Sequence, residues 1–208
     1  MYETSLRAAM AEFGASLFNR GYSAGSSGNM SVRLPNGCIL ATPTNSSMGR
    51  LVPERLSLVS MDGELLSGDK PSKECAFHRE IYKARPDCNA VVHLHSTYAT
   101  ALSCLAGLDA EDVLRPFTPY YVMKVSPLPL VPYFKPGSQK LFDAIARQAE
   151  KSASMLLANH GAITTGSSLE QAVNAAEELE ETARLFFILH GKDIRYLADA
   201  EIAELKPR

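Results

Sequence analysis

The chain of 208 residues is 46% hydrophobic and has a formal net charge of −2. This length can bury one sizeable core, so we expect a single domain over residues 1–208. The nearly balanced charge excludes the basic surface of proteins that bind nucleic acid or anionic membranes. An anionic ligand would have to be captured by a local site, so we expect a small-molecule ligand and neither a nucleic-acid nor a membrane partner.

The N-terminal segment carries Glu3, Arg7 and Glu12, which interrupt its apolar residues. It lacks the apolar core of a signal peptide, and no later run is long enough for a membrane span. The cysteines show neither a C-x-x-C pair nor the spacing of a disulfide framework, which favours reduced thiols. The four residues are Cys38, Cys75, Cys88 and Cys104. We expect a cytoplasmic protein.

Apolar residues recur at helical spacing over residues 4–20 and Gly21 follows as a stop signal, so this segment is expected to be an amphipathic helix. A loop rich in glycine and serine, residues 21–33, comes next. Three apolar segments bounded by turn residues predict strands, and the second ends in a hairpin signal, Asp62-Gly63. These strands lie within residues 37–44, 56–63 and 90–97.

Between the second and third strands, residues 71–87 carry a helical apolar stripe, with Ser72 as the cap and Pro86 as the stop. The longest helix should begin at Ser168, which opens a capping-box pattern, and end at Gly191. Other expected elements are helices over 97–106 and 138–150, an interrupted extended segment over 122–133 and a tight strand pair over 154–166. Hairpin-linked strands with interspersed helices indicate an α/β layered fold with a largely antiparallel or mixed sheet.

The segment VVHLHST, residues 91–97, places His93 and His95 two positions apart in an apolar run. In a strand both imidazoles would point to one face while Val92 and Leu94 point to the other, so the pair could hold one ion. An isolated pair of this kind more commonly lies on a wet sheet face or is satisfied by core hydrogen bonds. The rest of the chain has to decide between these interpretations.

Two other places offer metal ligands. Glu74 lies near a helix start, and His160 lies in a turn before a glycine, where a side chain can be aimed into a cleft. Three histidines and one carboxylate suit zinc and are acceptable to other divalent first-row metals. Taken alone, His160 could equally be an ordinary turn histidine. His78 either packs or supports the ligands from behind, and His190 suits a helix end.

Six motifs occur in one order along the chain: SSGNMSVR, TPTNSSMG, PSKE, HLHS, TPYY and ANHG. This set resembles the class II aldolase/adducin family, over residues 4–195. Relatives in that family include L-fuculose-1-phosphate aldolase and L-ribulose-5-phosphate 4-epimerase. The resemblance implies a three-layer α/β/α fold with a central, largely antiparallel or mixed sheet. It also implies a catalytic zinc ion held by Glu74, His93, His95 and His160.

The loop GSSGNMS offers backbone N–H groups and short polar side chains for a phosphate, although alone it would be an ordinary turn. The resemblance implies phosphate contacts from Gly28, Asn29, Thr44, Asn45 and Ser72. Asn45 stands where the aldolase pattern has glycine, and asparagine tolerates a left-handed backbone. Lys73 stands where that pattern has serine, and its cation suits a substrate that carries a carboxylate as well as a phosphate. Without the resemblance, Lys73 could be a solvated surface lysine.

Two residues are candidates for proton transfer. Glu74, if a substrate displaces it from the metal, becomes a free carboxylate beside the reacting carbons. Tyr120 in TPYY matches a family tyrosine that reaches the site of a neighbouring subunit as a proton donor, which implies a homotetramer with sites at subunit interfaces. Without that match, Tyr120 and Tyr121 would be interpreted as strand aromatics.

The segments PTNSSMGRL, SGDKPSKE and TPYYVMKV are most similar to the branch of the family that decarboxylates 3-oxo-tetronate 4-phosphates. The resemblance implies that a phosphorylated four-carbon sugar acid loses carbon dioxide through a metal-stabilised enediolate and gives dihydroxyacetone phosphate. The alternative enzyme is a sugar-phosphate aldolase or epimerase of the fuculose- or ribulose-phosphate type. The alternative from another class is a non-enzymatic, adducin-like binding domain, which would not need the complete ligand set.

Overall fold

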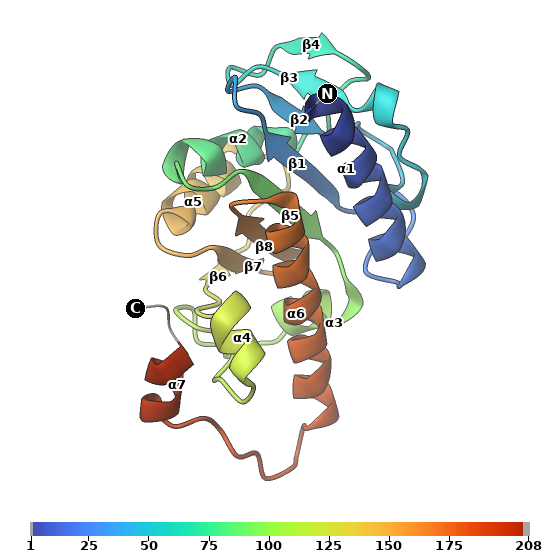
Figure 1. Ribbon diagram of the computed structural model, residues 1–208. Helices are drawn as coiled ribbons and strands as arrows, with labels where there is room; N and C mark the ends of the chain where they lie inside the picture. The colour runs from blue at the N-terminus through green and yellow to red at the C-terminus, as the bar shows by residue number, and fades with distance from the viewer. Residues whose placement is uncertain (1, 206–208) are drawn as a thin grey trace.

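The computed structural model describes residues 2–205 and shows an eight-stranded sheet with helices on both faces (Figure 1). The strand order across the sheet is β4-β3-β2-β1-β5-β8-β7-β6. Neighbouring strands are antiparallel, except that β6 and β7 are parallel, so the predicted mixed sheet is confirmed. The strands are β1 (Asn29–Arg33), β2 (Ile39–Ala41), β3 (Ser57–Val59), β4 (Leu65–Ser67), β5 (Ala90–Leu94), β6 (Leu130–Val131), β7 (Ser154–Leu157) and β8 (Gly161–Gly166).

Helices α1 and α6 cover one face of the sheet, and α2 and α5 cover the other (Figure 1). A third buried cluster joins α3, α4 and the second half of α6. The helices are α1 (Tyr2–Asn19), α2 (Cys75–Ala84), α3 (Thr97–Ser103), α4 (Pro119–Lys124), α5 (Gln139–Ala149), α6 (Leu169–Ile188) and α7 (Asp199–Leu205), and short 3-10 turns span Met48–Arg50 and Pro53–Arg55. The expected three-layer α/β/α arrangement is therefore confirmed.

Strand β5 shows how alternation separates the two faces. Val92 and Leu94 join the cluster under α1 and α6, whereas Val91 joins the cluster under α2 and α5. The imidazole of His93 points the same way as Val91, and its ring meets Phe77 of α2 edge to face at a centroid distance of 5.5 Å. The predicted alternation holds and directs this histidine toward α2.

Other local signals also lead to the elements that they predict. Ser168 accepts a hydrogen bond from the backbone N–H of Gln171 at 3.2 Å and opens α6. Gly191, just beyond the end of this helix, has a φ of 74°, a conformation that favours glycine. The β3–β4 hairpin and the β7–β8 pair lie where the sequence predicts them. Within residues 2–205, no helix combines the length and the apolar character needed to cross a membrane.

The expected glycine and serine loop over residues 21–33 is shorter than predicted, because β1 begins at Asn29. Met30 and Val32 pack into the cluster under α1 and α6, while the alternate residues Asn29 and Ser31 face α2 and the residue just before it. The polar side chains made this segment look like a loop. They are buried because groups on α2 give them hydrogen-bond partners.

The prediction that Ser72 caps α2 is wrong. The residue before the first helical residue is Glu74, and its side chain makes no capping hydrogen bond. The hydroxyl of Ser72 instead accepts the backbone N–H of Glu74 at 3.3 Å. The helix therefore starts two residues later than a Ser72 cap would require, and the Glu74 carboxylate is free to point elsewhere.

The extended segment expected over residues 122–133 is also wrong at its start, because α4 occupies Pro119–Lys124. Thr118 accepts a hydrogen bond from the N–H of Tyr121 at 3.3 Å, and proline at the first helical position is favourable. Tyr120 and Tyr121 therefore lie on a helix and not on a strand. Tyr121 is buried, whereas Tyr120 is 59% exposed. Helix α7 was not predicted.

Two isoleucines test the location of the core. Ile163 in β8 is 0% exposed, whereas Ile188 at the end of α6 is 59% exposed. We expect Ile163→Ala to lower the free energy of unfolding by about 2 to 5 kcal/mol, because it removes buried methyl groups and leaves a cavity. The matched change Ile188→Ala should cost less than about 0.5 kcal/mol. Urea unfolding followed by circular dichroism measures both, and equal losses would contradict this core.

Candidate metal centre and active site

Four potential metal ligands converge beyond the end of β5: Glu74, His93, His95 and His160. One ligand atom from each lies within 4.8 Å of the others. The Nε2 atoms of His93 and His95 are 2.9 Å apart. Oxygens of Glu74 lie 3.6 Å from the Nε2 of His93 and 3.6 Å from the Nε2 of His160. A helix start, a strand end and a turn thus present their side chains to one point.

This donor set fits a divalent metal ion. A tetrahedral ion with bonds of about 2.0 to 2.1 Å keeps its ligand atoms about 3.3 to 3.4 Å apart. The separations of 2.9 and 3.6 Å lie on either side of that value. Three imidazole nitrogens and one carboxylate oxygen suit zinc and other divalent first-row ions. The four side chains could therefore hold one ion after small adjustments.

The imidazole of His93 is held in one orientation. Its Nδ1 lies 2.9 Å from the carbonyl oxygen of Ala162 on β8, so the Nδ1–H donates to that carbonyl and Nε2 keeps its lone pair. Burial lowers the pKa of His93 to about 3. Burial, and then the neighbouring imidazoles, lower the pKa of His95 to about 4. Both rings are neutral at neutral pH, which is the form that binds metals.

Glu74 is oriented by its place just before α2 and by Asn29 on β1. The amide nitrogen of Asn29 donates to Oε2 of Glu74 at 2.6 Å. This hydrogen bond ties the start of α2 to the sheet and keeps the carboxylate turned toward the imidazoles.

The turn between β7 and β8 presents His160. Asn159 has a left-handed φ of 58°, which asparagine tolerates. The N–H of Asn159 donates to the carbonyl of Ser103 at 3.0 Å, and the N–H of His160 donates to its hydroxyl at 3.2 Å. A Cβ at Gly161 would collide with the carbonyl oxygen of Leu94. Glycine therefore allows β8 to approach β5 closely, directly after the histidine.

A buried carboxylate on α6 supports the segment that follows His95. Glu180 accepts a hydrogen bond from the hydroxyl of Ser96 at 2.6 Å, and from the N–H groups of Tyr98 and Ala99 at 2.8 Å each. These N–H groups lie in the first turn of α3 and have no acceptor within the helix. The negative charge also suits this end of the helix. Glu180 therefore fixes the backbone immediately after a potential metal ligand.

A hollow of about 410 Å³ opens beside the four ligands. The residues with an expected binding role that line it are Gly28, Asn29, Thr44, Asn45, Ser72 and Lys73, together with Glu74 and His95. Asn45 has a φ of 57°, so asparagine does adopt the left-handed backbone at this position. Lys73 is exposed at the rim. It takes part in none of the ion pairs within the described residues.

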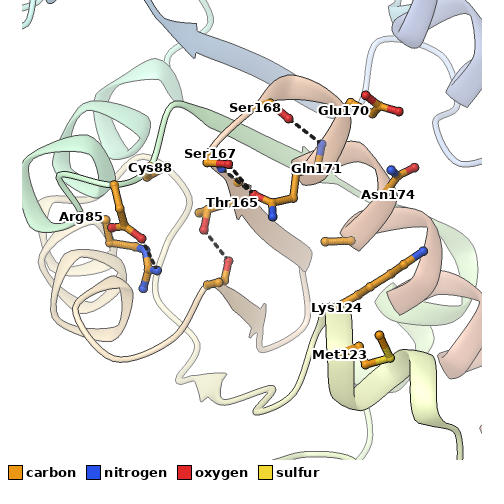
Figure 2. A pocket seen from close by; sticks show the side chains of 14 residues that line it. Arg85, Cys88, Met123, Lys124, Thr165, Ser167, Ser168, Glu170, Gln171 and Asn174 are labelled. Atoms are coloured by element: carbon orange, nitrogen blue, oxygen red, sulfur yellow. Dashed lines mark hydrogen bonds and ion pairs between the residues drawn. The ribbon is translucent and has the colours of Figure 1, made fainter. Parts of the chain in front are cut away.

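The structure does not bring Tyr120 to this hollow, since its exposed side chain on α4 is absent from the lining. A larger hollow of about 620 Å³ lies between α4 and the start of α6 (Figure 2). Arg85, Lys124 and Gln171 are among its labelled residues in Figure 2. It has no cluster of potential metal ligands among the described residues, so its size alone does not make it the reaction site.

The chain matches the family model of the Class II Aldolase and Adducin N-terminal domain over residues 8–187. The chain belongs to this family. The match spans every strand of the sheet and all four potential metal ligands. The class II aldolase architecture and the resemblance of the six motifs are thereby confirmed.

Named relatives and a solved structure extend the match over nearly the whole chain. A 3-oxo-tetronate 4-phosphate decarboxylase of Escherichia coli strain K12 is 56% identical over 204 residues, which are 98% of this chain and 96% of the relative. An L-fuculose phosphate aldolase of Methanococcus maripaludis strain S2 is 37% identical over 84% of this chain and 92% of its own length. The crystal structure of YgbL from Klebsiella pneumoniae is 55% identical, with a TM-score of 0.97 over 99% of this chain and 100% of that chain.

Sequence reasoning missed several residues around the site. Glu180 and Ser103 fix the segments that carry ligands, but each does so through contacts with distant parts of the chain. Six further residues line the hollow: Ser26, Ser27, Pro43, Ser46, Pro136 and Gly137. Ser26, Ser27, Pro43 and Ser46 lie within the motifs SSGNMSVR and TPTNSSMG, although none of them was given a role of its own. Pro136 and Gly137 precede α5 and carry no local signal of a site.

The buried neutral imidazoles predict how the metal-free protein responds to acid. Burial lowers the pKa of His93 and of His78 to about 3, below the usual value of 6.5. Below pH 6.5 the unfolded chain takes up protons that the folded chain does not. The free energy of unfolding is therefore unaffected by these histidines above pH 6.5 and falls as the pH falls toward 3. We expect each of the two histidines to lower the free energy of unfolding by about 2 kcal/mol at about pH 5. Urea unfolding of chelator-treated protein at neutral and mildly acidic pH measures the loss. Equal stability at both would contradict it.

Proposed function

We propose that this protein decarboxylates a 3-oxo-tetronate 4-phosphate to dihydroxyacetone phosphate and carbon dioxide. The observation that carries the proposal is the placement of Lys73 on the rim of a hollow that also contains the ligand cluster and the polar loops. A substrate with a phosphate at one end and a carboxylate at the other needs all three features. The similarity to relatives that are named for this reaction supports the same assignment.

The reaction begins from a β-keto acid. The bond between the carboxylate carbon and C2 breaks, carbon dioxide leaves, and the electron pair stays on the C2–C3 unit as an enediolate. A proton then adds to C2 and gives dihydroxyacetone phosphate. A divalent cation held by Glu74, His93, His95 and His160 supplies positive charge that lowers the energy of the developing negative charge. We propose zinc, because three nitrogens and one oxygen are typical of its sites.

The chain's own residues hold the two ends of the substrate. Gly28 and Asn29 on one side, and Thr44 and Asn45 on another, offer donors to the phosphate in a hollow without excess positive charge. Ser72 adds a hydroxyl beside them. This arrangement leaves the ammonium group of Lys73 for the carboxylate or for the outer edge of the phosphate.

Proton delivery involves Glu74 or Tyr120. Glu74 lies among the ligands and can hold a proton next to the reacting carbons once the substrate displaces it. Tyr120 is 59% exposed on α4 and is not part of its own subunit's hollow. We propose that the chain assembles into a homotetramer in which Tyr120 reaches the hollow of a neighbouring subunit.

The second candidate is a sugar-phosphate aldolase or epimerase, supported by the similarity to the Methanococcus maripaludis aldolase. It would use the same ligands and the same phosphate loops. It would not need a cation at position 73, because its substrate has no carboxylate. An adducin-like binding domain would need no convergent ligand cluster at all, and this chain has one.

Lys73 separates the decarboxylase from the aldolase. We expect Lys73→Ser to lower kcat/KM for decarboxylation by roughly ten- to a hundredfold, because it removes a charge-assisted bond worth about 1.5 to 3 kcal/mol. Lys70→Ser is the matched control, since Lys70 is an exposed lysine outside the hollow. Release of carbon dioxide and formation of dihydroxyacetone phosphate are followed together with both enantiomers of the acid.

The decarboxylase proposal fails if the wild-type protein releases no carbon dioxide from either enantiomer. The role of Lys73 fails if Lys73→Ser and Lys70→Ser react at the same rate. Efficient cleavage of fuculose 1-phosphate by the wild type, undiminished in Lys73→Ser, would establish the aldolase instead.

A shared site predicts complementation between inactive subunits. Tyr120→Phe keeps Glu74, and Glu74→Gln keeps Tyr120, so mixed oligomers contain some sites with both groups intact. We expect co-expressed variants to be more active than the sum of the two separate variants. Tyr2→Phe, a change at a tyrosine that is 61% exposed on α1, should retain full activity. Light scattering that finds a fully active monomer would contradict the shared site.

A further inference from the structure

A row of polar side chains is buried between β1 and α2, behind the proposed metal ligands. Asn29 donates from Nδ2 to Glu74 at 2.6 Å. Two residues along β1, the hydroxyl of Ser31 lies 2.7 Å from Nδ1 of His78 and 2.8 Å from the hydroxyl of Tyr82. Glu74, just before α2, and His78 on α2 are four positions apart, so the strand and the helix make two parallel pairs of polar contacts, Asn29 with Glu74 and Ser31 with His78.

Two atoms in this row have no hydrogen-bond partner among the described residues: Oδ1 of Asn29 and Nε2 of His78. Both atoms are buried, and an unpaired buried polar atom is costly because it gives up its hydrogen bonds to water without a replacement. The unpaired amide atom of Asn29 is the oxygen, an acceptor. The amide nitrogen has to face Glu74, because a carboxylate only accepts hydrogen bonds. A donor at Nε2 of His78 would be its natural complement.

The hydroxyl of Tyr82 decides whether Nε2 is a donor. Tyr82 is 1% exposed, and its hydroxyl has Ser31 as its hydrogen-bond partner within residues 2–205. Since a buried hydroxyl proton is costly to leave unpaired, Tyr82 donates to Ser31, and Ser31 donates to Nδ1 of His78. Burial lowers the pKa of His78 to about 3, so the ring is neutral and carries its one proton on Nε2. The unpaired nitrogen is therefore a donor.

We propose that one buried water molecule joins Nε2 of His78 to Oδ1 of Asn29 and completes this row. Along β1 the Cα atoms of alternate residues are about 6.6 Å apart, and on a helix the Cβ atoms of residues one turn apart are about 5 to 6 Å apart. The two pairs of polar contacts are therefore spaced by about this distance. One water with two hydrogen bonds of about 2.8 to 2.9 Å spans up to about 5.7 Å. Buried waters typically pair polar groups of this kind. The completed chain of hydrogen bonds runs through Tyr82, Ser31, His78, the water, Asn29 and Glu74.

This chain makes His78 a positioning residue. It fixes which end of the Asn29 amide faces Glu74, and thereby the orientation of the carboxylate among the imidazoles. The positioning role rests on the proposed metal site. The water and the tautomer of His78 do not, because both can be measured in metal-free protein.

A crystal structure that resolves ordered solvent tests the water directly. We expect one water within hydrogen-bond distance of both atoms, and a dry gap or a direct contact between His78 and Asn29 would overturn the proposal. Nuclear magnetic resonance of protein labelled with ¹⁵N-histidine should show His78 with its proton on Nε2 at neutral pH. A proton on Nδ1 would overturn the direction of the chain.

Metal affinity tests the positioning role. Ser31→Ala breaks the chain, and we expect zinc affinity, measured by competition with a chelator, to fall roughly tenfold. Ser154→Ala is the matched control, since both serines lie in strands at 0% exposure, and it should bind as the wild type does. His78→Gln, which keeps a donor near Nε2, should bind more tightly than His78→Leu.

Equal zinc affinities for Ser31→Ala and Ser154→Ala, or for the two His78 variants, would overturn the positioning role. A purely structural role would lower the unfolding temperature of these variants without such differences in zinc affinity. Failure of the wild type to bind zinc would instead refute the proposed metal site together with the positioning role. The crystal structure and the tautomer then decide the water on their own.

Discussion

Uncharged imidazoles bind a metal only if their lone pairs already point to one place, and the structure is arranged around that constraint. Three of the four potential ligands are held by partners on different elements: a carbonyl on β8 for the His93 ring, an amide on β1 for the Glu74 carboxylate, and a serine at the end of α3 for the His160 backbone. Such partners offset the cost of burying these polar groups. The cluster of ligands and the packing of the central strands therefore depend on one another.

The same end of the sheet also collects the groups that would hold the substrate. Loops before β1, after β2 and before α2 all line one hollow beside the ligands. Antiparallel pairing of β5 with β1 and with β8 brings segments from the first and last thirds of the chain together there. Close approach of β8 to β5 requires the glycine at position 161, since any Cβ would strike the neighbouring backbone. The polar loops and the four potential metal ligands thus lie together at one end of the sheet.

Much of this site could be predicted from the sequence, because its signals are local. Two histidines at strand spacing, and a third before a glycine, are possible ligands without knowledge of the fold, and the family resemblance is what joins them with Glu74 into one set. What could not be predicted depends on distant contacts. Glu180 is one acidic residue among several on α6, and its role appears only when Ser96, 84 positions away, is brought to it. Strand β1 looked like a loop for the same reason, since Ser31 is polar in sequence and buried only because α2 supplies its partners. The helix that carries Tyr120 had a Thr-Pro start signal, but the tyrosines after it favour a strand equally.

The central claim is that Glu74, His93, His95 and His160 hold one divalent ion. Anomalous diffraction from zinc-loaded crystals, with data collected on both sides of the zinc absorption edge, tests this most directly. The account predicts one strong peak per subunit within coordinating distance, about 2.0 to 2.2 Å, of all three histidine nitrogens and of a Glu74 oxygen when no substrate is bound. A peak elsewhere in the molecule, or none at these side chains in protein saturated with zinc, would contradict it.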